Sequence, residues 1–376
     1  VMGNALERRA GEKLRVILGK LTKNKATGFL TGLGVTAIIQ SSSATTVMVV
    51  GFVNSGLMTL KQAINVIMGA NIGTTVTAWI LSLGGIESDN TFVQLLKPTA
   101  FTPILALIGI IFTMMSKSDS KKDTGTILLG FATLMFGMNT MSAAVKPLEG
   151  DPQFCSIMTM FSNPLLGVLV GALMTAALQS SSVSVGILQS LSNATGGITY
   201  AIALPIILGS NIGSCVTAMI SSVGANKSAR RVAIVHLFFN IIGTLLFLSL
   251  FYLLNAFLHF TFLDDVLNST GIAVIHTVFN VLATSAFLPF TKQSEKLAHL
   301  IIRDDPNDDS EDSKVPILDE RLLLTPSVAI EQCRNVAIRM ARITRKTINS
   351  SINTLTEYEQ KMTADIMEAE NLIDID

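Results

Sequence analysis

A polar tetrapeptide that twice interrupts apolar sequence limits what this chain can fold into more than any other feature. The block Gln-Ser-Ser-Ser, from Gln40 to Ser43, recurs from Gln179 to Ser182. Each copy is followed about thirty residues later by Gly-x-Asn-Ile-Gly, which contains Asn71 in the first case and Asn211 in the second. The matched blocks keep one order at an offset of 139 to 140 residues. This pattern predicts an internal duplication.

The composition indicates that the duplicated unit lies in a membrane. The 376 residues are 49% hydrophobic and 14% charged, whereas soluble domains carry about 25% charged residues. The mean hydropathy is +0.54, which favours an all-α polytopic membrane protein. The net charge of zero gives no reason to expect nucleic acid, and the three cysteines are too far apart to predict a disulfide or a transition-metal site.

Apolar runs define the expected membrane segments, because a spanning helix needs about 20 apolar residues. The serine blocks divide residues 26–53 and 165–192 into two short halves each, which predicts two re-entrant helical hairpins. The Asn-Ile-Gly blocks lie inside residues 62–83 and 199–222, which are expected to be broken transmembrane helices. Further spans are expected at residues 92–115, 124–145, 230–254 and 270–290, and surface segments at 7–25 and 147–164.

The same runs predict four units along the chain. These are a first transmembrane repeat (1–123), a second repeat with two further helices (124–303), an acidic linker (304–325), and an incomplete soluble domain of one helix and part of a second (326–376). Met2 aligns with Met141, which ends an apolar run. Most of the first helix of the first repeat is therefore expected to be missing from this chain.

The distribution of charge predicts the orientation. Lysine and arginine gather on one side, for example in residues 8–25, 117–122 and 227–231, whereas residues 84–91 and 255–269 on the other side have none. The positive-inside rule places the first side, with the C-terminus, in the cytoplasm. The two hairpins would then enter from opposite sides, which is an inverted repeat of the kind found in secondary transporters.

The repeated polar blocks favour ion binding. Polar groups at membrane depth are costly unless they line a cavity or bind a ligand. Serines at a hairpin tip expose N–H groups at a half-helix N-terminus, and these groups with the hydroxyls suit an oxyanion. Amide, hydroxyl and freed carbonyl oxygens suit a hard cation such as Na+. Thr45, Thr46, Ser184 and Ser190 are expected only to support helix packing or to hydrogen-bond within their helix.

A second repetition has no role that the sequence reveals. Ala233, His236, Phe239 and Asn240 recur 40 residues later as Ala273, His276, Phe279 and Asn280. The pattern indicates a similar helix used twice. Each histidine is expected simply to hydrogen-bond a neighbouring helix.

These motifs together resemble the type II sodium–phosphate cotransporter family, bacterial branch. The resemblance covers nearly the whole chain, and the tail from about Pro326 looks like the start of a PhoU-like helical domain. It implies a Na+-coupled symporter that imports inorganic phosphate across the bacterial inner membrane by alternating access. It implies no enzyme activity and no cofactor apart from co-transported Na+.

The resemblance also implies residue roles. Phosphate is expected at Ser41, Ser42, Ser43, Ser180, Ser181 and Ser182. Sodium is expected at Gln40, Gln179, Asn71, Asn211, Thr74, Thr75, Thr77, Ser210, Ser214 and Thr217. Cys215 stands where the family more commonly has threonine.

Several alternatives stay open. The chain could move another oxyanion, or act as a phosphate exporter or regulator through its tail. An intramembrane serine hydrolase would need an activated serine, with His236 as the base. Neither serine block has a Gly-x-Ser-x-Gly turn, and a single-site hydrolase gains nothing from two blocks. The sodium stoichiometry and a homodimer formed by the His-x-x-Phe-Asn helices are also left open.

Overall fold

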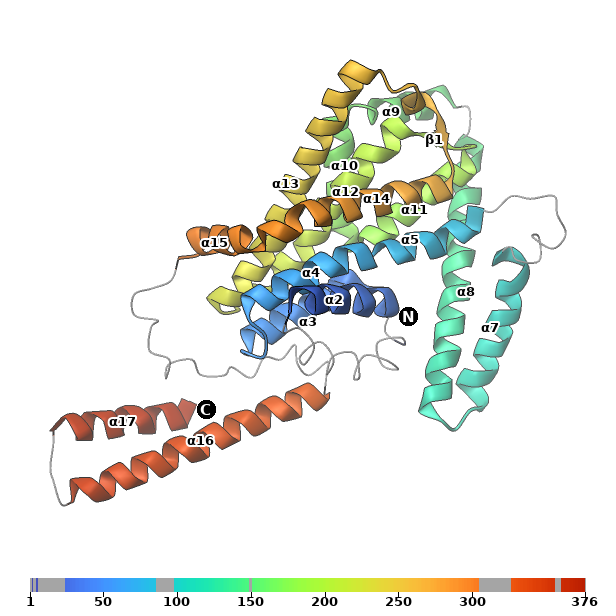
Figure 1. Cartoon of the computed structure of the whole chain (residues 1–376). Helices are drawn as coiled ribbons and strands as arrows, with labels where there is room; N and C mark the ends of the chain where they lie inside the picture. Colours follow the sequence, from blue (N-terminus) through green and yellow to red (C-terminus); the bar gives the residue numbers. More distant parts are fainter. Residues whose placement is uncertain are drawn as a thin grey trace.

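The computed structural model describes residues 24–85, 98–148, 151–303, 326–355 and 360–375, together with Met2 and Ala5. Most of this part of the chain is helical (Figure 1). The elements are α2 (Lys25–Ile39), α3 (Ser42–Asn54), α4 (Leu60–Gly73), α5 (Thr75–Ser82), η1 (Leu83–Gly85), α7 (Pro98–Met115), α8 (Asp119–Val145), η2 (Lys146–Leu148), α9 (Pro152–Met160), α10 (Pro164–Leu178), α11 (Ser181–Ala194), β1 (Ile198–Thr199), α12 (Tyr200–Ser221), α13 (Lys227–Leu258), η3 (Thr261–Asp264), β2 (Val266–Leu267), α14 (Ser269–Phe287), η4 (Leu288–Phe290), α15 (Thr291–Ile301), α16 (Pro326–Thr354) and α17 (Gln360–Ile375).

The described residues contain five helical segments that are apolar and long enough to cross a membrane. They are Leu60–Gly85, Asp119–Leu148, Tyr200–Ser221, Lys227–Leu258 and Ser269–Ile301. Helices can span a bilayer because they satisfy their backbone hydrogen bonds internally. The prediction of an all-α polytopic membrane protein is therefore confirmed. The inverted orientation of the repeats stays a prediction.

The serine blocks divide their apolar runs as predicted. Helices α2 and α3 are separated at Gln40 and Ser41, and α10 and α11 are separated at Gln179 and Ser180. Both helices of the first pair contact α4, and both helices of the second contact α12. Each repeat therefore contains a two-helix unit against a longer apolar segment, which is Leu60–Gly85 in the first repeat and α12 in the second.

The predicted helix breaks at Asn-Ile-Gly are wrong for the second repeat. Helix α12 runs without interruption through Asn211 and Gly213. In the first repeat a single residue, Thr74, separates α4 from α5, and its backbone angles (φ −60°, ψ −31°) are helical. The glycines that suggested a break have another role, because they lie where a neighbouring helix approaches most closely.

Close contact between backbones fixes each two-helix unit to its long helix. A β-carbon on Gly69 of α4 would overlap the carbonyl oxygen of Phe29 in α2, and one on Gly209 of α12 would overlap that of Val168 in α10. Gly32 and Gly171 make the reverse contacts, against the carbonyl groups of Val66 and Ile206. Small residues allow this approach in membrane helix pairs. The same packing is thus built twice.

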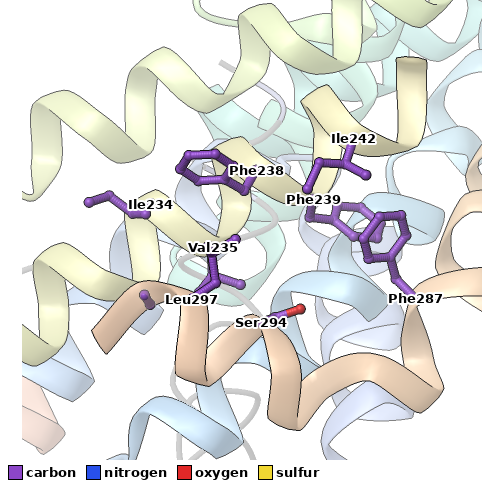
Figure 2. A pocket seen from close by; sticks show the side chains of 9 residues that line it. Ile234, Val235, Phe238, Phe239, Ile242, Phe287, Ser294 and Leu297 are labelled. Atoms are coloured by element: carbon purple, nitrogen blue, oxygen red, sulfur yellow. The ribbon is translucent and has the colours of Figure 1, made fainter. Parts of the chain in front are cut away.

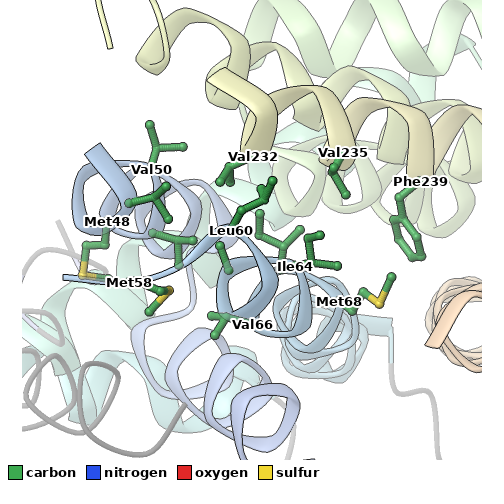
Figure 3. Close-up of a cluster of buried hydrophobic side chains, with 14 of the residues drawn as sticks. Met48, Val50, Met58, Leu60, Ile64, Val66, Met68, Val232, Val235 and Phe239 are labelled. Carbon is green, nitrogen blue, oxygen red and sulfur yellow. The ribbon is translucent and has the colours of Figure 1, made fainter. Parts of the chain in front are cut away.

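Two buried apolar clusters follow the duplication. The first includes side chains of α3, α4 and α13, among them Val50, Ile64 and Phe239 (Figure 3). The second includes side chains of α11, α12 and α14, among them Leu188 and Ile272. Helix α13 therefore contributes to the core around the first hairpin, and α14 contributes to the core around the second.

The remaining elements surround these two halves. Helix α8 reaches α5 through a small cluster of Leu81, Met135 and Met138, and it begins five residues earlier than the predicted span 124–145. Strands β1 and β2 pair antiparallel, with Ile198 opposite Leu267. Helix α9 lies in the predicted surface segment. The predicted surface helix 7–25, except its last two residues, and the linker 304–325 lie outside the described residues.

The C-terminal tail forms two helices, α16 and α17, as the sequence predicted (Figure 1). The start of α16 touches the membrane part of the chain. The Gln332 side chain is 2% exposed and donates from Nε2 to the carbonyl oxygen of Ser55 at 3.0 Å. Ser55 lies between α3 and α4, so the tail contacts the connection that leaves the first hairpin.

The glycine contacts generate a stability prediction. Gly69→Ala and Gly209→Ala should each lower the free energy of unfolding by about 1–3 kcal/mol, because the added methyl group has no space. The midpoint of thermal unfolding of the purified protein measures this effect. Gly34→Ala is the matched control, since no atom of a described residue lies within 4 Å of its β-carbon position. An equal loss in all three variants would contradict the packing argument.

Candidate anion and cation site

Both serine blocks form the same junction between two helices. Gln40 ends α2 with φ of 60°, and Gln179 ends α10 with φ of 55°. This left-handed conformation is typical of helix ends. Ser41 and Ser180 are then extended, and α3 and α11 begin directly after them. Each tip therefore joins the C-terminus of one helix to the N-terminus of the next.

The first serine of each block caps its helix. Ser41 Oγ accepts a hydrogen bond from the N–H of Ala44 at 3.2 Å, and Ser180 Oγ accepts one from the N–H of Val183 at 3.4 Å. The next two residues lie in the first helical turn, where the helix provides no acceptor for their N–H groups. The positive end of the helix dipole adds to those groups. The N–H groups left for an anion are those of Ser42, Ser43, Ser181 and Ser182.

The two tips touch each other. Ser43 Oγ donates to the main-chain carbonyl oxygen of Gln179 at 3.0 Å, across 136 residues of sequence. The tips of the two hairpins therefore meet in the structure. The contact brings the two predicted groups of phosphate-binding serines to one place, in which Ser42 is half-buried and Ser181 is 3% exposed.

The Asn-Ile-Gly blocks lie against the tips. A β-carbon on Gly73 would overlap the side chain of Thr36, and one on Gly213 would overlap that of Thr175. Thr36 and Thr175 are one turn before Gln40 and Gln179. The predicted sodium ligands of α4, α5 and α12 are thereby carried on helices that contact the last turn of α2 or α10.

A hydrogen bond between side chains closes each hairpin at this level. Thr36 Oγ1 donates to Thr45 Oγ1 at 3.0 Å, and Thr175 Oγ1 donates to Ser184 Oγ at 2.7 Å. These buried bonds join the two helices that meet at each tip. These four residues, which flank the serine blocks, thus stabilise the hairpins and do not take up the serine side chains at the tips.

Three predicted sodium ligands carry buried oxygen atoms that no described group satisfies. Thr77 and Thr217 occupy matched positions in α5 and α12, and the hydroxyl of each has no hydrogen-bond partner there. Gln40 Oε1 is in the same condition, while its Nε2 donates to the carbonyl of Ala37. Such an atom costs about 1–3 kcal/mol, and a bound cation would remove that cost. Gln179 is exposed, so the two glutamines are not equivalent.

The other predicted hydroxyls bond to main-chain carbonyl groups of the preceding turn. Thr74, Thr75, Ser210 and Ser214 each donate to a carbonyl oxygen three or four residues earlier, at 2.7–3.0 Å. A donating hydroxyl keeps lone pairs that can still face a cation. Cys215 is fully buried, and its sulfur receives a hydrogen bond from Asn240 at 3.2 Å. The sulfur thus joins α12 to α13.

The asparagines of Asn-Ile-Gly bind the repeated His-x-x-Phe-Asn helices, a role that sequence reasoning missed. Asn71 Nδ2 donates to Asn240 Oδ1 at 3.4 Å, and Asn211 Nδ2 donates to Asn280 Oδ1 at 3.3 Å. The 40-residue repetition was the available signal. It showed that two helices are alike, but the partners of Asn240 and Asn280 lie 169 and 69 residues away in the sequence.

Most of the residues expected only to support packing do so. Thr45, Thr46 and Ser184 donate to the carbonyl groups of Ser41, Ser42 and Ser180 in the preceding turn. Each histidine was expected to hydrogen-bond a neighbouring helix, and among the described residues this expectation is wrong. The rings of His236 and His276 are buried, and neither nitrogen of either ring has a hydrogen-bond partner there.

A separate crevice of about 20 Å³ lies between α13, the end of α14 and α15 (Figure 2). Phe238, Phe239 and Phe287 line it, and Ser294 adds a hydroxyl. A space of this volume holds a single water molecule, and it is too small for phosphate. None of the predicted ion-binding residues lines it.

Comparison with known proteins identifies the family. The sequence profile described as Na+/Pi-cotransporter matches residues 1–143 and again residues 134–268. The chain belongs to this family. A Bacillus subtilis relative, YqeW, is 31% identical over 64% of this chain and 73% of its own length. Human sodium-dependent phosphate transport protein 2B is 37% identical over 32% of this chain and 19% of its own length.

A further relative has a different name. The Escherichia coli K12 protein called "Putative inorganic phosphate export protein YjbB" is 29% identical over 88% of this chain. The alignment covers 58% of that protein, so this chain spans less than two thirds of its length. No solved structure shows significant similarity to the chain.

The caps predict different effects for neighbouring serines. Ser41→Ala and Ser180→Ala should each lower the free energy of unfolding by about 1 kcal/mol, because a helix start loses its acceptor. Ser182→Ala should leave it unchanged. Thermal unfolding of the three purified variants measures the difference. A loss in Ser182→Ala as large as in Ser180→Ala would contradict the assignment of the caps.

Proposed function

We propose that this chain is a Na+-coupled phosphate symporter of a bacterial inner membrane, with phosphate between the two serine tips and Na+ beside them. The observation that carries the proposal is the hydrogen bond from Ser43 to the Gln179 carbonyl. It brings two helix N-termini to one place, and each N-terminus has N–H groups without an acceptor in its own helix. Membership of the Na+/Pi-cotransporter family supports the choice of ions.

The tips suit phosphate but cannot neutralise it alone. Residues 36–46 and 175–185 contain no lysine or arginine. Each helix N-terminus contributes about half a positive charge, so two contribute about one. Inorganic phosphate is a mixture of its monovalent and divalent anions near neutral pH, so it carries between one and two negative charges. Binding of a divalent phosphate in a region of low dielectric constant therefore requires cations as well, which gives a physical reason for coupling.

The cation would lie on the other side of the same junctions. The C-terminus of α2 carries the negative end of a helix dipole, and Gln40 Oε1 is buried there with no hydrogen-bond partner in the part of the chain that the structure describes. Thr77 and Thr217 provide matched buried hydroxyls. Gln179, Asn71, Asn211 and the remaining predicted hydroxyls complete the proposed set of oxygen donors. Na+ and phosphate would thus bind as neighbours, each reducing the charge that the other must leave in the membrane.

Transport would follow from movement of the hairpins relative to each other. The predicted inverted repeat gives two related units around one site, as in other alternating-access transporters. The charge distribution favours a cytoplasmic C-terminus. In that orientation the contact between Gln332 and Ser55 would place the tail at the cytoplasmic end of the first hairpin.

Export is the second candidate, and the name of the Escherichia coli relative favours it. A symporter carries its ions down their combined gradient, so the same site can support either direction. A dedicated exporter would differ in needing no Na+ for phosphate efflux. A hydrolase is disfavoured, because the buried ring nitrogens of His236 have no hydrogen-bond partner in the described part of the chain, so no described serine hydroxyl is bonded to them.

Substitution of the serines that follow the two helix caps tests the phosphate site. Ser42→Ala and Ser181→Ala should lower Na+-driven phosphate uptake into proteoliposomes at least tenfold, if each removes about 1.4 kcal/mol or more of binding. Ser190→Ala is the matched control, because Ser190 lies in the same helix as Ser181 but nine residues further from the tip, and its buried hydroxyl has no hydrogen-bond partner among the described residues. Wild-type uptake in both test variants would refute the site.

Reversal of the gradients tests the direction. Proteoliposomes loaded with phosphate and Na+ should release phosphate into Na+-free medium faster than vesicles loaded with phosphate and K+. With the gradient reversed, proteoliposomes that have Na+ only on the outside should take phosphate up. Efflux at equal rates in Na+ and K+, without Na+-driven uptake, would favour the exporter.

A further inference from the structure

We propose that Asn240 and Asn280 are a matched pair of positioning residues that aim the amide oxygens of Asn71 and Asn211 at bound cations. This inference rests on the proposed function for the identity of the cation as Na+. It assigns a role to the repeated His-x-x-Phe-Asn helices. The hydrogen bonds described for their asparagines go to residues outside the two serine blocks.

The amide of Asn240 is held in one orientation by its own helix. Its Nδ2 donates to the carbonyl oxygen of His236 at 3.0 Å and to the sulfur of Cys215 at 3.2 Å. A carbonyl oxygen can only accept, so the side of Asn240 facing it must be the NH2 group. The Oδ1 of Asn240 is left for α4, where it accepts from Asn71 Nδ2 at 3.4 Å.

This arrangement determines which atom of Asn71 is available. Asn71 is 8% exposed, and its NH2 group is used by Asn240. The Oδ1 of Asn71 must then face away from Asn240, and it has no hydrogen bond to a described residue. An asparagine that turned its amide over would present NH2 to the site and repel a cation. Asn240 therefore selects the oxygen.

The second repeat shows the same arrangement. Asn280 Nδ2 donates to the carbonyl oxygen of His276 at 2.8 Å, and Asn280 Oδ1 accepts from Asn211 Nδ2 at 3.3 Å. Asn211 is 5% exposed. In each repeat, a separate pair of hydrogen bonds thus holds the amide groups of the two asparagines in the same orientation. Chance packing would not be expected to repeat the polarity of both bonds.

Each positioning helix is also attached to the far end of the hairpin that it serves. At the start of α13, Asn226 donates from its main chain to Asn54 Oδ1 at 2.7 Å, at the end of α3. At the start of α14, Ser269 Oγ donates to Asn193 Oδ1, at the end of α11. Helix α13 therefore holds the first hairpin and its Asn-Ile-Gly block together, and α14 does so for the second.

Sodium-dependent thermal stabilisation of the purified full chain tests the inference without requiring transport. The unfolding midpoint is measured against NaCl concentration, with KCl keeping the ionic strength constant, because a ligand of the folded state raises the midpoint by mass action. Asn240→Leu and Asn280→Leu should each raise the half-saturating Na+ concentration about tenfold. The same shift should appear in the Na+ dependence of phosphate uptake, with little change in uptake at saturating Na+.

Two controls separate positioning from stability. Asn65→Leu removes another buried asparagine of α4, whose Nδ2 donates only to the carbonyl of Lys61 among described residues. It should leave the Na+ dependence of the midpoint unchanged, whatever change it causes in the midpoint in K+. In the background of Asn71→Ala, adding Asn240→Leu should cause no further shift, because the two residues act through one oxygen.

The outcomes are distinct. The inference would be overturned if Asn240→Leu and Asn280→Leu left the Na+ dependence unchanged, or if they shifted it only as much as Asn65→Leu does. A wild-type chain that is not stabilised by Na+ would overturn it as well. A chain that binds Na+ with the expected shifts, but does not transport phosphate, would uphold the inference and refute the proposed function.

Discussion

The structure depends on how closely two backbones can approach. At Gly69 and Gly209 the long helices α4 and α12 have no side chain, and the carbonyl groups of α2 and α10 occupy that space. This contact sets the depth of each tip relative to its long helix. If a methyl group separated the helices, the Asn-Ile-Gly blocks would no longer lie beside the last turns of α2 and α10. The polar site therefore rests on close backbone contacts that involve no polar side chain.

A second constraint is electrostatic. At each tip two residues separate a helix C-terminus from a helix N-terminus, so opposite partial charges adjoin. A single junction of this kind offers weak sites for both signs of ion. Because two junctions meet through Ser43 and Gln179, the weak sites add up. A pair of ions of opposite charge suits this environment better than either ion alone.

The sequence allowed prediction of the local features and of those that it repeats. A polar block in apolar sequence ends a helix by local geometry, so the hairpins at Gln40 and Gln179 were predictable. The Asn-Ile-Gly blocks were misread because glycine lowers helix propensity, while here Gly213 serves a contact with another helix. Pairs such as Asn71 with Asn240, and Ser55 with Gln332, depend on the tertiary fold, and no local pattern specifies them.

The two tips have equal sequences but different states. Ser43 donates to the Gln179 carbonyl, and Gln179 is exposed, whereas the amide oxygen of Gln40 is buried. The roles can be exchanged without new chemistry: Ser182 would donate to the carbonyl of Gln40, and Gln40 would become the exposed residue. The exchanged form would make the same kind of contact with the roles of the two tips reversed. One duplicated sequence would then encode both end states of a reversible cycle.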